Sequence, residues 1–208
     1  MDAISMLVSV PVCSFRKPYA REFLETERFP PPATVYGFLL SLVGEEDREA
    51  YVGTKLALAV VEEPAVSTIL RTTWRIKIKK SPPGTGKNKK PDYQEILTGL
   101  HLYICVSDCP LVVELKKVAE SPQEIERFGG LSLGESRDLV NEIVFDPPLK
   151  GQIGQWLHSD DRGQCPLPIW VDHVGSKGTV WGKFSMVQAP LFGEIHTDDT
   201  RWVLISKE

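Results

Sequence analysis

The segment Thr68–Lys79 (TILRTTWRIKIK) carries the strand pattern and the charge from which the rest of the chain can be interpreted. From position 74 onward apolar and cationic residues alternate strictly, in the order Trp74, Arg75, Ile76, Lys77, Ile78 and Lys79. Side chains of a β-strand point alternately to its two faces, so the pattern predicts a strand with one apolar and one cationic face. The cationic side chains would follow one another at about 7 Å, close to the phosphate repeat of an extended single strand.

Positive charge is concentrated around this strand. The chain of 208 residues has a formal net charge of −4, which by itself argues against a nucleic-acid partner. Residues 71–90 nevertheless contain no acidic residue and eight basic ones, namely Arg71, Arg75, Lys77, Lys79, Lys80, Lys87, Lys89 and Lys90. Such a local patch in an acidic chain indicates a polyanion-binding surface, and Trp74 and Tyr93 flank it as rings on which bases can stack. The alternative is a solvated edge hairpin whose lysines prevent aggregation.

The surrounding sequence predicts an α+β chain. Residues 81–90 (SPPGTGKNKK) are too rich in Pro, Gly and Lys to fold by themselves, so a basic finger is expected between two paired strands. Alternation predicts strands over residues 5–15, 54–62, 68–79, 99–106 and 140–145. Helices are expected over 34–42 and 108–119, with Thr34 and Asp108 as N-caps, and a short helical piece over 122–127.

The order strand, helix, strand, strand, helix, strand predicts a ferredoxin-like βαββαβ domain over residues 1–145 with an inserted basic β-hairpin. Residues 146–208 predict a small C-terminal β-rich subdomain, because they contain the strand-like segments 152–158, 168–173, 179–187 and 201–206. Four of the five tryptophans lie in this last part, where we expect them to anchor a small core.

Composition excludes several classes of protein. The longest apolar run, Leu56–Val61, is far shorter than the roughly 20 residues of a membrane span, and the N-terminus lacks the basic residues of a secretory signal. We therefore expect a cytoplasmic protein without membrane contact. The four cysteines are expected as thiols, and His101, Cys105 and Cys109 lack the second ligand pair of a zinc site, so neither metal nor cofactor is expected.

A glycine-rich stretch, Gly129–Ser136 (GGLSLGES), imitates two catalytic motifs. As a P-loop it has Glu135 where a phosphate-binding lysine is required. As a nucleophile elbow it fits G-x-S-x-G with Ser132, and His173 or His196 would complete a triad, but it follows a predicted helix instead of a strand. A third interpretation is a loop whose backbone approaches a phosphate. Its candidate contacts are Gly129, Gly130, Ser132, Gly134, Ser136 and Arg137.

Three motifs in this order carry a family resemblance: FPPPATVYG at 29–37, PDYQEIL at 91–97, and GGLSLGES. Together they resemble the CRISPR-associated Cas-five family, RAMP-superfamily subunits of type I Cascade complexes. The resemblance implies an RRM-type domain with a protruding thumb over about residues 71–97, a non-catalytic subunit that binds the 5′ handle of the CRISPR guide RNA. It implies as partners backbone RAMP subunits and the large PAM-reading subunit, with target DNA contacted indirectly.

By the same analogy the loop after the first strand would lie near the handle, with Arg16, Lys17, Arg21 and Arg28. Aromatic motifs typical of RRM sheets are not evident, which favours contacts through the loop and the thumb. Some relatives also cleave precursor RNA, which needs a general base, and His101 beside Tyr103 is the candidate for this alternative.

Overall fold

The computed structural model describes residues 3–107, 109–172, 178–191, 195–196 and 198–208. This part of the chain forms one ten-stranded sheet with two α-helices. All strand pairs are antiparallel except that between β2 and β5. The strands are β1 Ile4–Cys13, β2 Phe23–Leu24, β3 Lys55–Val60, β4 Ala65–Trp74, β5 Lys89–Val106, β6 Glu142–Phe145, β7 Ile153–Ser159, β8 Cys165–Val171, β9 Thr179–Pro190 and β10 Val203–Leu204. The helices are α1 Pro32–Val43 and α2 Pro110–Glu120, with 3-10 turns η1 Gly86–Asn88 and η2 Pro122–Glu124.

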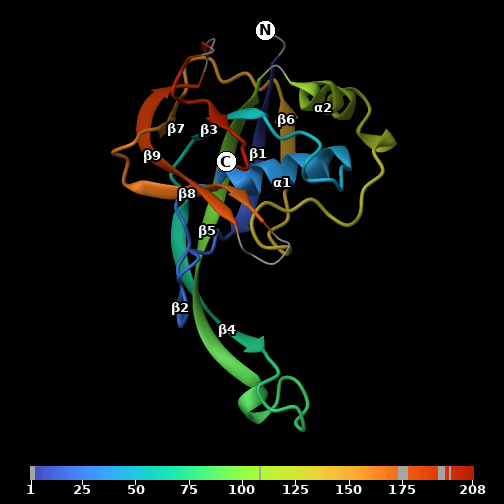
Figure 1. The fold of residues 1–208 in the computed structure, drawn as a ribbon, viewed down its shortest axis with the longest axis vertical. Coiled ribbons are helices and arrows are strands. Elements are labelled where there is room, and N and C mark those ends of the chain that lie inside the picture. Colours follow the sequence, from blue (N-terminus) through green and yellow to red (C-terminus); the bar gives the residue numbers. More distant parts are fainter. Residues whose placement is uncertain (1–2, 108, 173–177, 192–194, 197) are drawn as a thin grey trace.

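The main hydrophobic core lies between one face of the sheet and the helices α1 and α2, which cover that face (Figure 1). Alternate residues of β1 are buried on this face, in the order Ile4, Met6, Val8 and Val10. The opposite face of the sheet has its own smaller core, in which Ala57 and Ala59 of β3 pack with Leu149, Trp156 and Leu191. Both faces of the central strands are therefore buried, which explains the continuous apolar character of β3.

One sheet contains strands from both the N-terminal and the C-terminal parts of the chain. Its main path is β6-β1-β5-β3-β7-β9-β8, so the C-terminal strands continue the sheet of the N-terminal ones through the pairing of β3 with β7. Leu157, Leu167 and Phe184 from the C-terminal strands belong to the same buried cluster as α1 and β1. The division between residues 1–145 and 146–208 stays a prediction about organisation, and one sheet and one shared core cross it.

Both helices begin one or more residues away from the expected N-caps. Pro31 is the N-cap of α1 and Pro32 its first residue, so the prediction of Thr34 as N-cap is wrong. Proline at the first helical position is favoured because its φ is preset and its missing N–H would have no partner there. The N-cap of α2 is Cys109, whereas Asp108 lies outside the described residues.

The thumb, which we define as residues 65–98, extends away from the body as a long hairpin (Figure 1). Its two strands pair in unbroken register from Ala65 opposite Thr98 to Trp74 opposite Lys89. Of the 18 residues of β5, the first ten (89–98) therefore lie in the thumb and the last eight (99–106) in the body. The short strand β2 pairs with β5 where the thumb leaves the body, at Phe23 opposite Tyr93.

The tip of the thumb, residues 75–88, differs from the sequence prediction in two ways. The strand ends at Trp74, so residues 75–79 do not present one cationic and one buried apolar face, and Ile76 is 73% exposed. Residues 81–90 were expected to have no structure of their own, but they contain η1. Both differences have one cause, the buried side chain of Asn88. Its Oδ1 accepts hydrogen bonds from the amides of Lys77 (2.9 Å) and Ile78 (2.7 Å), and its Nδ2 donates to Ser81 O (2.7 Å), which folds the chain back.

Candidate nucleic-acid interface

The tip and the last residues of β4 and β5 beside it carry the exposed cations of the thumb and one exposed aromatic ring. Lys77, Lys79, Lys80, Lys87 and Lys89 are exposed, while Arg75 donates from Nε to the carbonyl of Lys87 at 3.2 Å. The Trp74 ring lies against Gly84, where an added Cβ would be 2.6 Å from Trp74 Cε2. Since Trp74 is still 69% exposed, one side of the ring is fixed and the other is open to solvent. A positively charged surface with an open ring is the combination that single-stranded nucleic acids bind.

At the base of the thumb a polar network joins β4 and β5 to the glycine-rich loop, and we call it the latch. Its members are Arg71, Gln94, Glu135 and Arg137. Glu135 accepts from Arg71 Nη1 at 3.0 Å and from Arg137 Nε at 3.1 Å. The side chain of Gln94 is buried. Its Oε1 accepts hydrogen bonds from Arg71 and from Arg137, the latter at 2.9 Å, and its Nε2 donates to Ser14 Oγ at 2.8 Å. Two of the predicted contact residues, Arg71 and Arg137, are thus brought together, with part of their charge balanced by Glu135.

Asp138 fixes the conformation of the glycine-rich loop. Its Oδ2 accepts from the backbone N–H of Ser14 at 2.9 Å and of Glu135 at 2.8 Å. Gly134 has a φ of +123°, and an added Cβ would lie 2.6 Å from Asp138 Oδ2 and 2.9 Å from Ser14 O, so this position requires glycine. The amide of Glu135 is already used inside the loop, and Ser136 and Arg137 are the exposed residues at its turn. Gly129 and Gly130 precede it on the surface.

Ser132 is half-buried and forms an isolated antiparallel bridge with Leu139. Within the described chain, the segment before it is η2 and a turn, so the strand that a nucleophile elbow needs does not precede it. His173 lies outside the described residues. His196 lines a separate pocket with Tyr103 and Trp202.

The loop after β1 folds against the side of the thumb. The amide of Thr26 donates to Glu95 Oε2 at 3.1 Å, and Arg28 pairs with Glu95 at 3.5 Å. Arg16 donates to the carbonyl of Ala20 at 2.9 Å, Lys17 lies 3.8 Å from Glu25, and Arg21 is exposed. Four predicted contact residues therefore lie on a segment anchored to β5 at the thumb base.

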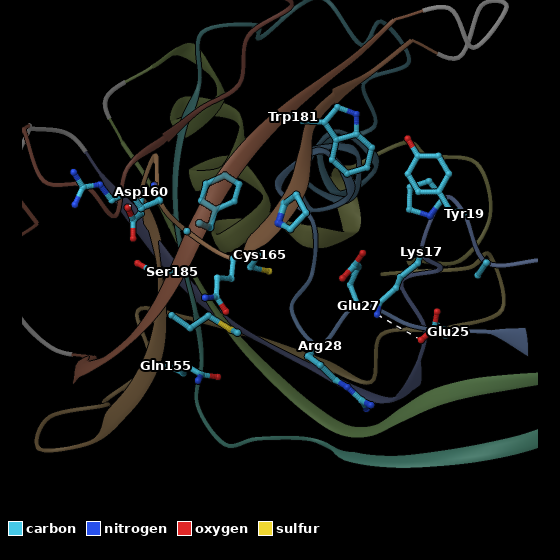
Figure 2. Close-up of a pocket in the computed structure, with 18 residues that line it drawn as sticks. Lys17, Tyr19, Glu25, Glu27, Arg28, Gln155, Asp160, Cys165, Trp181 and Ser185 are labelled. Carbon is cyan, nitrogen blue, oxygen red and sulfur yellow. Dashed lines mark hydrogen bonds and ion pairs between the residues drawn. The ribbon is translucent and has the colours of Figure 1, made fainter.

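A cleft that the sequence did not predict separates this loop from the C-terminal strands (Figure 2). It has a volume of about 840 Å³. The loop contributes Lys17, Tyr19, Glu27 and Arg28, and strands β7 to β9 with their connections contribute Gln155, Asp160, Cys165, Trp181 and Ser185. Trp156 and Trp170 are buried as expected of core anchors, whereas Trp181 is 40% exposed at the cleft. Burial raises the pKa of the Cys165 thiol, which keeps it protonated.

His101 and Tyr103 lie on the same face of β5, in the body. Tyr103 packs edge-on against the Trp156 ring at 5.8 Å between centroids, and burial raises the pKa of its hydroxyl. Within the described residues, no three His, Cys, Asp or Glu side chains come together as a metal site. Nor does any helix among them have the length and apolarity to cross a membrane.

The fold and the site define a mixed α/β protein with a mostly antiparallel sheet, one hairpin of which projects as a cationic arm. No family model matches the chain. A curated protein named "CRISPR-associated protein Cas5" from Myxococcus xanthus (strain DK1622) is 40% identical over 184 residues, which is 85% of this chain and 86% of that protein. The chain belongs to the CRISPR-associated Cas5 family, which confirms the family predicted from the three motifs.

Two solved structures share the fold. A chain of a "CRISPR RNA-guided surveillance complex" superposes with a TM-score of 0.63 at 12% identity, covering 88% of this chain and 89% of that chain. A second chain, described as "Cas protein", gives a TM-score of 0.52 at 10% identity, with 90% and 95% covered. The prediction of an α+β chain is confirmed at the level of a mixed α/β fold with a mostly antiparallel sheet.

Proposed function

We propose that this chain is a non-catalytic subunit of a type I Cascade complex that binds the 5′ handle of the CRISPR guide RNA. The observation that carries the proposal is the thumb, which carries exposed lysines and the exposed ring of Trp74 on one hairpin of an otherwise acidic chain. Phosphates would meet the cations of the tip, while unpaired bases would stack on the exposed ring. The loop cations at 16–28 and the turn of the glycine-rich loop extend this surface to the thumb base.

Membership of the Cas5 family also supports proposals about the domain type, the partners and the cellular location. We propose that the body is a ferredoxin-like, RAMP-type domain; the strand order β6-β1-β5-β3, with α1 between β1 and β3 and α2 between β5 and β6, supports this. The partners would be backbone RAMP subunits and the large PAM-reading subunit, with target DNA contacted only indirectly and the complex located in the cytoplasm. No cofactor is part of the proposal.

The decisive test is to replace Arg75, Lys77 and Lys79 together by glutamate. About four phosphate contacts predict a log-log salt slope near −3 for wild type, a loss of roughly fifty-fold in affinity between 50 and 200 mM salt. We expect the variant to lose guide-RNA retention and most of this slope with an unchanged melting temperature, because the three side chains are exposed.

The matched control reverses Lys116 and Lys117 of α2, which lies away from the thumb in Figure 1, together with Arg127 outside the thumb, and it should retain the RNA. Retention by the thumb variant equal to wild type would contradict the proposal. The ribonuclease alternative is separated by incubation with labelled repeat RNA without metal: cleavage that is lost in His101→Ala would establish it, and retention without cleavage supports a binding subunit.

A further inference from the structure

The cleft of Figure 2 has a charge-balanced lining, unlike the thumb. Its cations are Lys17, Arg28 and Arg162, and its carboxylates are Glu25, Glu27 and Asp160. Two glutamine amides, those of Gln155 and Gln164, add both donors and acceptors. Equal numbers of positive and negative side chains do not attract a phosphate strongly, but they suit a neutral group that presents hydrogen-bond donors and acceptors on one edge. A nucleobase is such a group.

Two aromatic rings line the cleft and are open to solvent. Tyr19 is 87% exposed and Trp181 is 40% exposed. They come from segments far apart in the chain, the loop after β1 and strand β9, and Figure 2 shows both at the same end of the cleft. Exposed rings beside a cavity are platforms on which a base stacks, whatever its identity.

Glu27 lies in the interior of the cleft, between Cys165 and Lys17 in Figure 2. Its carboxyl forms no hydrogen bond or ion pair with the part of the chain that the structure describes, although its neighbours Thr26 and Arg28 are both bonded. Burial raises the pKa of Glu27, an effect that nearby Lys17 opposes and Glu25 reinforces. Glu27 is half-buried, so its carboxyl is partly desolvated, and a ligand with two adjacent N–H donors would supply the hydrogen bonds that it lacks. Among the RNA bases guanine presents such a pair on its Watson–Crick edge.

The segment Thr26–Arg28 connects the cleft to the thumb. Thr26 and Arg28 both contact Glu95 of β5, so Glu27 is held between two residues that are fixed to the thumb strand. Phe23 and Tyr93, opposite each other in the β2–β5 pair, add two exposed rings at this junction. A strand bound along the thumb would therefore meet aromatic surface on its way to the cleft.

From these observations we infer that the cleft is a subsite for one unstacked guanine of the RNA, with the base between Tyr19 and Trp181 and its N1–H and N2–H donating to the Glu27 carboxylate. The inference rests on the proposed function, since the thumb supplies the affinity and the cleft would add base preference. The role of Glu27 is specificity, because its negative charge does not by itself favour a polyanion.

The test uses the purified full-length chain and short oligouridine RNAs that carry a single guanine, a single inosine or neither. Wild type should bind the guanine RNA about tenfold more tightly than oligouridine, the effect of one good bidentate base contact. Inosine lacks the exocyclic amino group and should lose most of that gain. In Glu27→Gln the preference should fall to near one, because the amide has one acceptor oxygen and its NH2 group would face a donor of the guanine.

Glu22→Gln is the matched control, since it makes the same charge change on the same loop at an exposed residue that does not line the cleft, and it should keep the guanine preference. Trp181→Phe should keep most of the guanine preference and Trp181→Ala should lose it, which separates stacking from charge. Preference for guanine that survives in Glu27→Gln, or that falls equally in both glutamine variants, would overturn the inference. Salt-dependent binding without base preference would also overturn it while leaving the proposed function intact, whereas no RNA binding at any salt concentration would refute both.

Discussion

Strand β5 passes through two regions that are stabilised in different ways. In the body, its residues Leu100, Leu102 and Ile104 are fully buried. In the thumb, the same strand has Lys89 and Tyr93 exposed, and every residue of its partner β4 is exposed or half-exposed. The body is therefore held by hydrophobic burial. Apart from Leu97, which is buried in the core of the body, the thumb is held by its backbone ladder and a few polar side chains. Because the exposed side chains of the thumb contribute little to folding, we interpret the thumb as a surface that binds a partner molecule.

The sharpest test of this contrast makes one chemical change in each region. Leu102→Ala removes a fully buried side chain in the body and should cost about 2–5 kcal/mol of unfolding free energy. Leu70→Ala removes a side chain that is 62% exposed on the thumb and should change stability by less than about 0.5 kcal/mol. Urea denaturation of the two variants measures both values. Equal losses would show that the thumb is part of the cooperative core.

The same contrast explains which features could be predicted from sequence. Body strands such as β1 follow the binary pattern because burial alone selects their apolar residues, and their positions were predicted within a few residues. The strand at 75–79 was predicted wrongly because the side chain of one distant residue, Asn88, overrides a strict alternation. The cleft was missed because its walls come from the loop after β1 and from β7 to β9, segments whose proximity no local pattern encodes. The exposed Trp181 could not be distinguished from the buried Trp156 for the same reason.

A second prediction concerns the junction between the two regions. Gly134→Ala should cost about 2 kcal/mol or more, because alanine at a φ of +123° is strained and its Cβ would collide with Asp138 and the carbonyl of Ser14. Gly129→Ala is the control: its φ is +74°, but its Cβ would meet nothing within 4 Å, so only the backbone penalty of about 1 kcal/mol remains. Thermal unfolding of both variants gives the difference. Indistinguishable melting temperatures would contradict the tight docking of the loop on β1.

The latch provides a pH-dependent prediction at the same junction. Burial raises the pKa of Glu135, but the bonds from Arg71 and Gln94 and the charge of Arg137 outweigh it, and the pKa lies below its ordinary value of 4.5. A lowered folded-state pKa means that the carboxylate stabilises the fold above the unfolded-state pKa and that this contribution is lost as pH falls through the folded-state pKa. Glu135→Gln should therefore cost about 1 kcal/mol at pH 7, a modest value because the pair is partly exposed.

The difference between Glu135→Gln and wild type should shrink below about pH 4 and vanish once the wild-type carboxyl is protonated. Glu114→Gln, which removes an exposed i,i+3 pair with Lys117 on α2, serves as the comparison and should have a much smaller effect at pH 7. Stability curves against pH for the three proteins measure this. A cost for Glu135→Gln that persists unchanged at low pH would show that packing, and not charge, holds the latch.

The smallest expected change in global stability comes from the tip, although its key residue is fully buried. Asn88→Ala removes the acceptor for the amides of Lys77 and Ile78 and the donor to Ser81, so the tip should lose its fold. Because the ladder of β4 and β5 joins the tip to the rest of the described chain, global unfolding should change by less than about 0.5 kcal/mol. Hydrogen exchange should show lost protection confined to residues 75–88. RNA affinity should fall as well, since the cations of the tip would no longer be held in place; unchanged affinity would mean that the tip binds by charge alone.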